Sequence, residues 1–283
     1  MKITFGNKLK ASFLLWADHT LLTKGEAFTN HSSQLFDISD EYALHYTYGA
    51  PFKGFVADSS ISGANVLSGV YIDETFTTKG NSNYIDVNYN EGQVYFDADQ
   101  GSSVISGDYA IKEYNIQLTD KTESTLLFET KYELAPQTAI NTANTGLAPN
   151  SLTYPAIYIM TRNLRNEELA LGGYEDTMYG LRMMVFSDSL FSLDAVNSIF
   201  LDRIRTCVTV LEESDFPFNA WGGLISDYNY TGLVSSKPSS SLAFIEDVTV
   251  SPINSTRVQT NNTEIFASII DLDISKHRYA RNE

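Results

Sequence analysis

The chain has 283 residues, of which 43% are hydrophobic and 19% are charged. It is therefore long and apolar enough to bury a core without disulfide or metal staples. Its 19 Lys and Arg against 35 Asp and Glu give a formal net charge of −16. Nonspecific binding to nucleic-acid phosphates requires Lys and Arg. The negative net charge therefore argues against a nucleic-acid-binding protein. No uncharged apolar run approaches the roughly 20 residues that cross a bilayer, so we expect no membrane contact.

The N-terminal residues predict one helix before any strand. Its apolar side chains recur at intervals of three and four residues, at Leu9, Phe13, Trp16, Ala17 and Leu21. Asn7 is a suitable N-cap, and Gly25 can end the helix in a left-handed conformation. The apolar stretch 13–16 is too short for the core of a secretory signal, so we expect the chain to be made and assembled in the cytoplasm.

Residues 71–118 predict a small antiparallel sheet. Asp73 and Glu74 separate two short β-rich runs, and the segment 90–92 separates two more. Both arrangements are typical of β-hairpins. A further run, 109–118, alternates apolar and polar side chains, and we expect it to extend this sheet as one strand.

The composition changes near the middle of the chain. Residues 1–134 contain nine Lys and no Arg, whereas residues 135–283 contain eight Arg and two Lys. The change coincides with 136–150, which has two prolines and no apolar periodicity, as is typical of a linker or long loop. We therefore predict four parts: an N-terminal helix and β-hairpin domain (1–135), the linker or long loop (136–150), an α+β domain (151–275) and a basic C-terminal tail (276–283).

The second half predicts a β-rich α+β fold, a sheet with one packed helix. The expected strands cover 155–160, 178–186, 242–250 and 264–274. Ser189 or Ser192 is a suitable N-cap for the helix. The apolar stripe of this helix consists of Leu193, Val196, Phe200, Ile204 and Cys207. We therefore expect Cys207, the single cysteine, to be an inert side chain inside the helix.

No motif in the sequence carries catalytic chemistry. The four histidines, His19, His31, His45 and His277, are not at the spacing of metal ligands. The nucleophile elbow and the glycine motifs that bind phosphates and dinucleotides are absent. We predict no catalytic, cofactor-binding or metal-binding residues, no cofactor and no enzymatic activity.

One segment partly matches a calcium-binding loop. Residues 86–92 place Asp or Asn at the first, third and fifth positions, as calcium loops do. Gly92, however, comes one position late, and Asp97 stands where a bidentate Glu is required. The same residues suit a hairpin turn, and we interpret both this segment and the second partial match at 97–101 as turns.

Three blocks together resemble proteins from the neck and tail-completion region of tailed bacteriophages. They are FLLWAD at 13–18 followed by GEAFT at 25–29, DSSISGA at 58–64 followed by GVYI at 69–72, and NEGQVYF at 90–96. The order strand, strand, helix, strand over 155–274 is similar to that of tail terminators, which form rings that cap the tail tube and join it to the head. The N-terminal region has no counterpart in the smallest terminators, and we expect it to be an added collar-like domain.

The resemblance implies a non-enzymatic virion structural protein, a tail terminator or head-tail connector, that forms a homo-oligomeric ring. We expect a hexamer, with other neck and tail proteins as partners and DNA only passing through the lumen. Four arginines, Arg162, Arg165, Arg203 and Arg205, are expected to pair with acidic faces of neighbouring subunits. The tail 276–281 is expected to be solvated, and docking onto an acidic neighbouring subunit is the alternative.

Two other classes remain open at the level of the sequence. A carbohydrate-binding or host-recognition module of a phage particle fits the aromatic residues and the Asn-rich turns. An enzyme, most plausibly a glycosidase that uses two carboxylates, has no positive motif. Three observations distinguish these classes. A ring protein forms a closed oligomer of fixed size, a carbohydrate-binding module is stabilised by its ligand, and an enzyme turns over a substrate.

Overall fold

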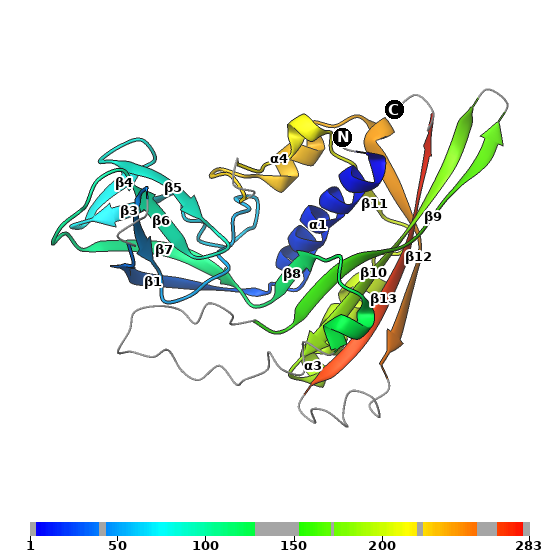
Figure 1. Ribbon diagram of the computed structural model, residues 1–283, viewed down its shortest axis with the longest axis horizontal. Helices are drawn as coiled ribbons and strands as arrows, with labels where there is room; N and C mark the ends of the chain where they lie inside the picture. Colours follow the sequence, from blue (N-terminus) through cyan, green and yellow to red (C-terminus); the bar gives the residue numbers. More distant parts are fainter. Residues whose placement is uncertain are drawn as a thin grey trace.

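The structure, a computed structural model, describes residues 4–39, 44–127, 153–170, 173–219, 223–253 and 265–279. Within these residues the chain forms two curled sheets, and helix α1 runs between them (Figure 1). The β-rich α+β class predicted from the sequence is confirmed. No helix in these ranges has the length and apolar character that a membrane crossing requires.

The helices of the described ranges are α1 (Phe5–Lys24), α3 (Leu190–Leu201) and α4 (Tyr230–Ser235), with 3-10 turns η1 (Glu213–Asp215) and η2 (Ser239–Ser241). The first sheet consists of β1 (Phe28–Asp37), β2 (Tyr46–Gly49), β3 (Gly69–Ile72), β4 (Thr75–Thr78), β5 (Tyr84–Asn88), β6 (Gln93–Phe96) and β7 (Ile105–Lys112). The second sheet consists of β8 (Asn115–Leu118), β9 (Ala156–Ala170), β10 (Tyr174–Ser187), β11 (Cys207–Thr209), β12 (Leu242–Pro252) and β13 (Phe266–Arg278).

The first sheet has the strand order β4-β3-β7-β1-β2-β6-β5, and its neighbouring strands are antiparallel. Its outer strands, β4 and β5, are consecutive in the chain and are joined by the turn 79–83, so the sheet curls back on itself like a barrel. Both predicted hairpins are confirmed. In the β3–β4 turn, Asp73 and Glu74 have positive φ angles of 46° and 67°, as a two-residue type I′ turn requires.

The predicted single strand at 109–118 is wrong. The chain forms β7 in the first sheet and then β8 in the second, where β8 lies parallel to β9. The crossover is held against α1, because the hydroxyl of Tyr114 lies 2.8 Å from Oδ1 of Asp18. The backbone N–H of Glu113 also donates to the carbonyl of Ala27 at 3.0 Å. Alternation alone does not reveal a change of sheet, since both strands keep a period of two.

The second sheet has the strand order β11-β12-β13-β10-β9-β8. Its central strands exceed the predicted lengths: β9, β10 and β13 have 15, 14 and 13 residues. The ends of β9 and β10 project beyond α1 and α4 (Figure 1), and we call residues 162–170 and 174–180 the arm. Helices α1 and α3 pack on one face of this sheet, and the helical residues 123–127 contribute Leu126 to a smaller apolar cluster on the other face.

Helix α1 is confirmed, but both of its ends differ from the prediction. Thr4 is the N-cap instead of Asn7. Gly25 is right-handed, with φ −89°, and Glu26 takes the left-handed conformation with φ 47°. A Cβ atom on Gly25 would lie 3.1 Å from Cδ1 of Ile199 on α3. The glycine therefore permits close packing of α1 against α3.

Helix α3 begins where the sequence predicts. The Oγ of Ser189 accepts a hydrogen bond from the backbone N–H of Ser192 at 3.2 Å, which is the geometry of an N-cap. Leu193, Val196 and Phe200 form its buried stripe.

The predicted end of α3 is wrong, and with it the placement of Cys207. The helix ends at Leu201, Ile204 is exposed, and Cys207 is exposed at the start of β11. Arg205 has a positive φ of 61°, and its N–H donates to the carbonyl of Ile245 at 2.9 Å. The turn into β11 is therefore set by pairing with β12, a contact distant in sequence.

The predicted basic tail begins inside β13. Residues 276–278 pair with residues 175–177 of β10, and the guanidinium of Arg278 lies 4.3 Å from the ring centroid of Phe5. The prediction of a solvated tail is wrong for this part, while residues 280–283 and the predicted linker 136–150 lie outside the described residues. One cluster of buried apolar side chains extends through α1 and both sheets, and the domain boundary stays a prediction.

Candidate functional site

The four histidines do not come together in the fold. His19, on α1, lies 2.7 Å from Asp58, whereas His45 and His277 lie 3.6 Å and 3.3 Å from carboxylates of Asp97 and Asp176. His31, on β1, packs against the ring of Phe52. In the described part of the chain, no group of three or more His, Cys, Asp and Glu side chains has metal-binding geometry.

The segment that resembles a calcium loop forms the end of a hairpin. Asn88 bonds across its turn, with Oδ1 accepting from the N–H of Glu91 at 3.2 Å. Asp86 lies within β5, and its carboxylate lies 2.6 Å from Nζ of Lys79 and accepts from the hydroxyl of Ser226 at 2.9 Å. In the second partial match, Asp99 accepts from the N–H of Gly101 at 2.8 Å. The side-chain oxygens of Asp86, Asn88 and Asp99 are therefore engaged by donors within the chain.

We expect millimolar calcium to leave the melting temperature unchanged, because these oxygens already have partners. Asn88→Ala should cost on the order of 1 kcal/mol through loss of the turn hydrogen bond. Thermal unfolding with and without calcium measures both effects. A rise of several degrees with calcium, absent in Asp86→Ala, would contradict the assignment of a turn.

The most deeply buried ionisable cluster joins three distant segments around Asp58, which is 1% exposed. One carboxylate oxygen of Asp58 lies 2.7 Å from Nδ1 of His19 on α1. The other accepts from the N–H and the hydroxyl of Ser60, at 2.9 Å and 2.7 Å, and from the N–H of Tyr230 at the start of α4, at 3.0 Å. The rings of His19 and Tyr230 also stack, with centroids 4.5 Å apart. The cluster connects the loop between β2 and β3 to helices α1 and α4.

Serine, histidine and aspartate are the residue types of a hydrolytic triad, but here their order differs. The hydroxyl of Ser60 bonds to Asp58, and Asp58 lies between Ser60 and His19. A triad requires the base to contact the nucleophile. The geometry is that of a carboxylate that satisfies several donors.

Burial by itself raises the pKa of the Asp58 carboxyl, but the hydrogen bonds from His19, Ser60 and the backbone of Tyr230 outweigh it. The net result is a pKa below the ordinary value of 3.8. A carboxyl with a lowered pKa in the folded state stabilises the fold when it is ionised.

The contribution of Asp58 to stability should therefore be complete above its ordinary pKa and be lost as the pH falls through its lower folded-state pKa. We expect the free energy of unfolding to decline in acid more steeply for the wild type than for Asp58→Asn, which cannot ionise. Urea unfolding of both proteins across the acidic range measures the difference. Parallel pH profiles would contradict a lowered pKa of Asp58.

The second sheet carries a charged network on the face opposite α1 and α3. Arg182 forms two hydrogen bonds with Asp271, at 2.7 Å and 2.8 Å, and also contacts Glu123. Arg162 lies 3.2 Å from Asp271 as well. Burial alone raises the pKa of Asp271, but Arg182 and Arg162 together lower it.

Two of the arginines expected at subunit contacts thus have acidic partners in their own chain. Arg162 pairs with Asp271, and Arg165 lies 3.2 Å from Glu167 within the arm. Among the described residues, Nε of Arg203 is buried and has no hydrogen-bond partner. A role at subunit contacts stays a prediction for all four arginines.

Comparison with known proteins gives no assignment. No family model and no curated protein matches this chain. The candidate sites therefore rest on the geometry alone.

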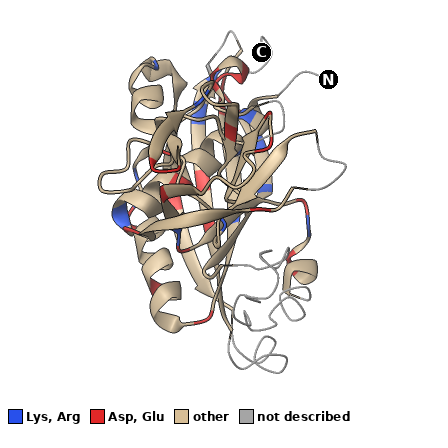
Figure 2. Cartoon of the chain, turned by 90° about the vertical axis from the view of Figure 1, so that its left-hand side faces the viewer, with Lys and Arg blue, Asp and Glu red and all other residues tan. Residues whose placement is uncertain are grey.

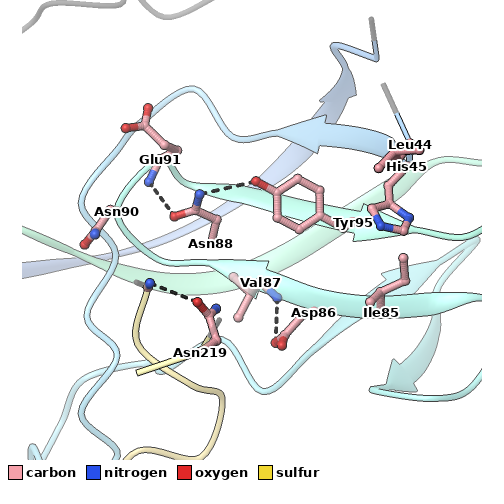
Figure 3. A pocket seen from close by; sticks show the side chains of 11 residues that line it. Leu44, His45, Ile85, Asp86, Val87, Asn88, Asn90, Glu91, Tyr95 and Asn219 are labelled. Carbon is pink, nitrogen blue, oxygen red and sulfur yellow. Dashed lines mark hydrogen bonds between the residues drawn. The ribbon is translucent and has the colours of Figure 1, made fainter. Parts of the chain in front are cut away.

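A pocket of about 400 Å³ lies on the first sheet, beside β5 and β6. It is lined by Leu44, His45, Ile85, Asp86, Val87, Asn88, Asn90, Glu91, Tyr95, Asn219 and Gly223. Asn90 and Glu91 lie at one end and Leu44 and His45 at the other, with the ring of Tyr95 between them (Figure 3). The sequence did not predict this pocket, because Asn219 comes from the second half of the chain.

The second sheet also has open edges. β8 pairs with β9 only as far as Ile159, so within the described residues the outer edge of the arm has no partner strand. On the opposite side, β11 pairs only with residues 242–244 of β12. The backbone groups at these edges are available to another strand.

Proposed function

We propose that this chain is a non-enzymatic structural subunit of the neck of a tailed bacteriophage, a tail terminator or head-tail connector. It assembles in the host cytoplasm into a closed homo-oligomeric ring in the virion. The ring joins the tail to the head and contacts other neck and tail proteins. The observation that carries this proposal is the six-stranded sheet, in which the exposed edge of the arm has no partner strand among the described residues.

An unpaired edge of this length favours pairing with another chain. Residues 162–169 are exposed throughout, and they present two apolar side chains, Leu164 and Leu169, which are 60% and 52% exposed. Charged side chains protect such edges in monomeric proteins, and the arm carries Arg165 and Glu167 as well. The two exposed leucines are therefore the part of the arm that favours contact with a second copy.

The two open edges of the sheet are different surfaces, the arm on one side and β12 on the other. A contact between two different surfaces of identical chains is head-to-tail, and it yields a ring when the rotation closes. The order of elements over 155–274 resembles that of tail terminators, and on this basis we expect six copies. The first sheet then forms an additional domain beside the ring.

The experiment that tests the ring is a mass measurement, made both on the purified chain and on assembled particles. We expect a fixed closed oligomer, six copies in the particle. Some ring proteins assemble only on the tube that they cap, so the copy number per particle decides. A monomer in solution that is also present as a single copy per particle would refute the ring.

The charge distribution leads to a prediction about DNA. Acidic and basic positions are interspersed over the elements in Figure 2, and several basic side chains are already paired with carboxylates. Six copies at −16 place on the order of a hundred negative charges in one layer, which suits a channel that passes DNA without holding it. We expect no duplex DNA binding even at low salt, where phosphate contacts are strongest. Salt-sensitive micromolar binding in a mobility-shift assay would contradict this.

A further inference from the structure

The pocket beside β5 and β6 has the chemistry of a ligand site that no part of the proposed ring uses. Neither Lys nor Arg lines it, so it offers no cation to an anionic ligand. Its two carboxylates are already neutralised, because Asp86 pairs with Lys79 at 2.6 Å and Glu91 pairs with Lys53 at 2.7 Å. A ligand of either charge gains little there.

Hydrogen-bonding groups remain at both ends of the pocket. The side-chain amide of Asn90 makes no hydrogen bond with the other residues drawn around the pocket (Figure 3), and the residue is exposed. At the other end, Nδ1 of His45 faces the carboxylate of Asp97 at 3.6 Å and makes no hydrogen bond in the described part of the chain. An amide offers both donors and acceptors, and an imidazole does the same. A ligand with several hydroxyl groups satisfies both.

The space between these ends is lined by both apolar and polar side chains, the polar ones being Asp86, Asn88 and Asn219. The ring of Tyr95 and the side chains of Leu44 and Ile85 supply its apolar part. The volume of about 400 Å³ lies within the range of small-molecule sites, about 300–1,000 Å³. A sugar ring has apolar C–H faces and hydroxyl groups around its edge. It therefore fits an aromatic surface with hydrogen-bonding groups at both ends.

We propose that this pocket binds a neutral saccharide of one or two sugar rings. The site joins the first sheet to Asn219 of the second half, so a bound sugar contacts both halves of the chain. The proposal does not depend on the ring, because all residues of the pocket come from one copy.

Ligand-observed NMR on the full chain tests the site, with glucose, galactose, N-acetylglucosamine, maltose and lactose as probes. We expect at least one of them to bind in the millimolar range, and Asn90→Ala to weaken that binding about tenfold or more. Asn90→Ala should fold normally, because the side chain is exposed. The matched control is Asn81→Ala, an exposed asparagine in the neighbouring turn outside the pocket, which should leave binding unchanged.

The alternative outcomes overturn the proposal. They are the absence of binding by all five sugars, and binding that Asn90→Ala leaves unchanged. Stronger binding of inorganic phosphate or calcium than of any sugar in the same assay would also overturn it, since the argument rests on a neutral pocket.

Discussion

Replacing Asp58 with alanine should destabilise the fold by about 3–5 kcal/mol, because each buried donor left without an acceptor costs about 1–3 kcal/mol. The change leaves the ring of His19 and the N–H groups of Ser60 and Tyr230 without their acceptor. Total stabilities of domains are about 5–15 kcal/mol, so the loss is a large part of the whole. Urea unfolding followed by fluorescence measures it.

Two further variants test whether the loss of stability in Asp58→Ala comes from the buried hydrogen bonds and not from removing any aspartate. Asp108→Ala removes an exposed aspartate from β7 and should change the free energy of unfolding by less than about 0.5 kcal/mol. Asp58→Asn keeps one acceptor oxygen for Ser60 and Tyr230 and should cost less than Asp58→Ala. Equal effects of Asp58→Ala and Asp108→Ala would show that the cluster does not fasten the fold.

The double change Leu164→Glu and Leu169→Glu should disrupt the proposed ring. Both side chains are more than half exposed on the arm, so the folded monomer should lose little stability. At a contact between copies, the new charges would be buried, and the opposite edge of the sheet carries Glu246 and Asp247. Placing like charges together costs several kcal/mol, and each 1.4 kcal/mol is tenfold in affinity, so assembly should weaken about a hundredfold or more.

Analytical ultracentrifugation and the copy number per particle measure this effect. The matched control introduces the same two charges elsewhere, as Leu44→Glu and Val104→Glu, at exposed apolar positions of the first sheet. The control should still form the ring. Normal assembly by the arm variant, or equal loss in both variants, would exclude the arm as the contact surface.

Elements defined by their immediate neighbours could be predicted from the sequence. Asp73 and Glu74 form the β3–β4 turn, since a two-residue hairpin turn depends on these positions alone. The cap at Ser189 and three of the five predicted stripe residues of α3, Leu193, Val196 and Phe200, were likewise correct. A turn or a cap involves residues within four positions of one another, and such signals are visible in the chain order.

The candidate sites could not be predicted, because they depend on contacts between distant residues. Asp58 meets His19 across 39 positions and Tyr230 across 172. Asn219 reaches the pocket from the second half of the chain. Neither Asp58 nor Asn219 stands in a catalytic or ligand-binding motif, so no local pattern predicts these contacts.

The sequence by itself determined the β-rich α+β class, the acidic surface, two hairpins and the start of α3, because composition, turn chemistry and caps act over short distances. Only the tertiary structure decided that the chain changes sheets after β7, that Cys207 opens an exposed strand, and that β13 continues through Lys276 to Arg278. These features depend on which strand or helix lies beside the segment. The stability of such a contact depends on the residues of both segments, so the sequence pattern of one segment cannot determine it.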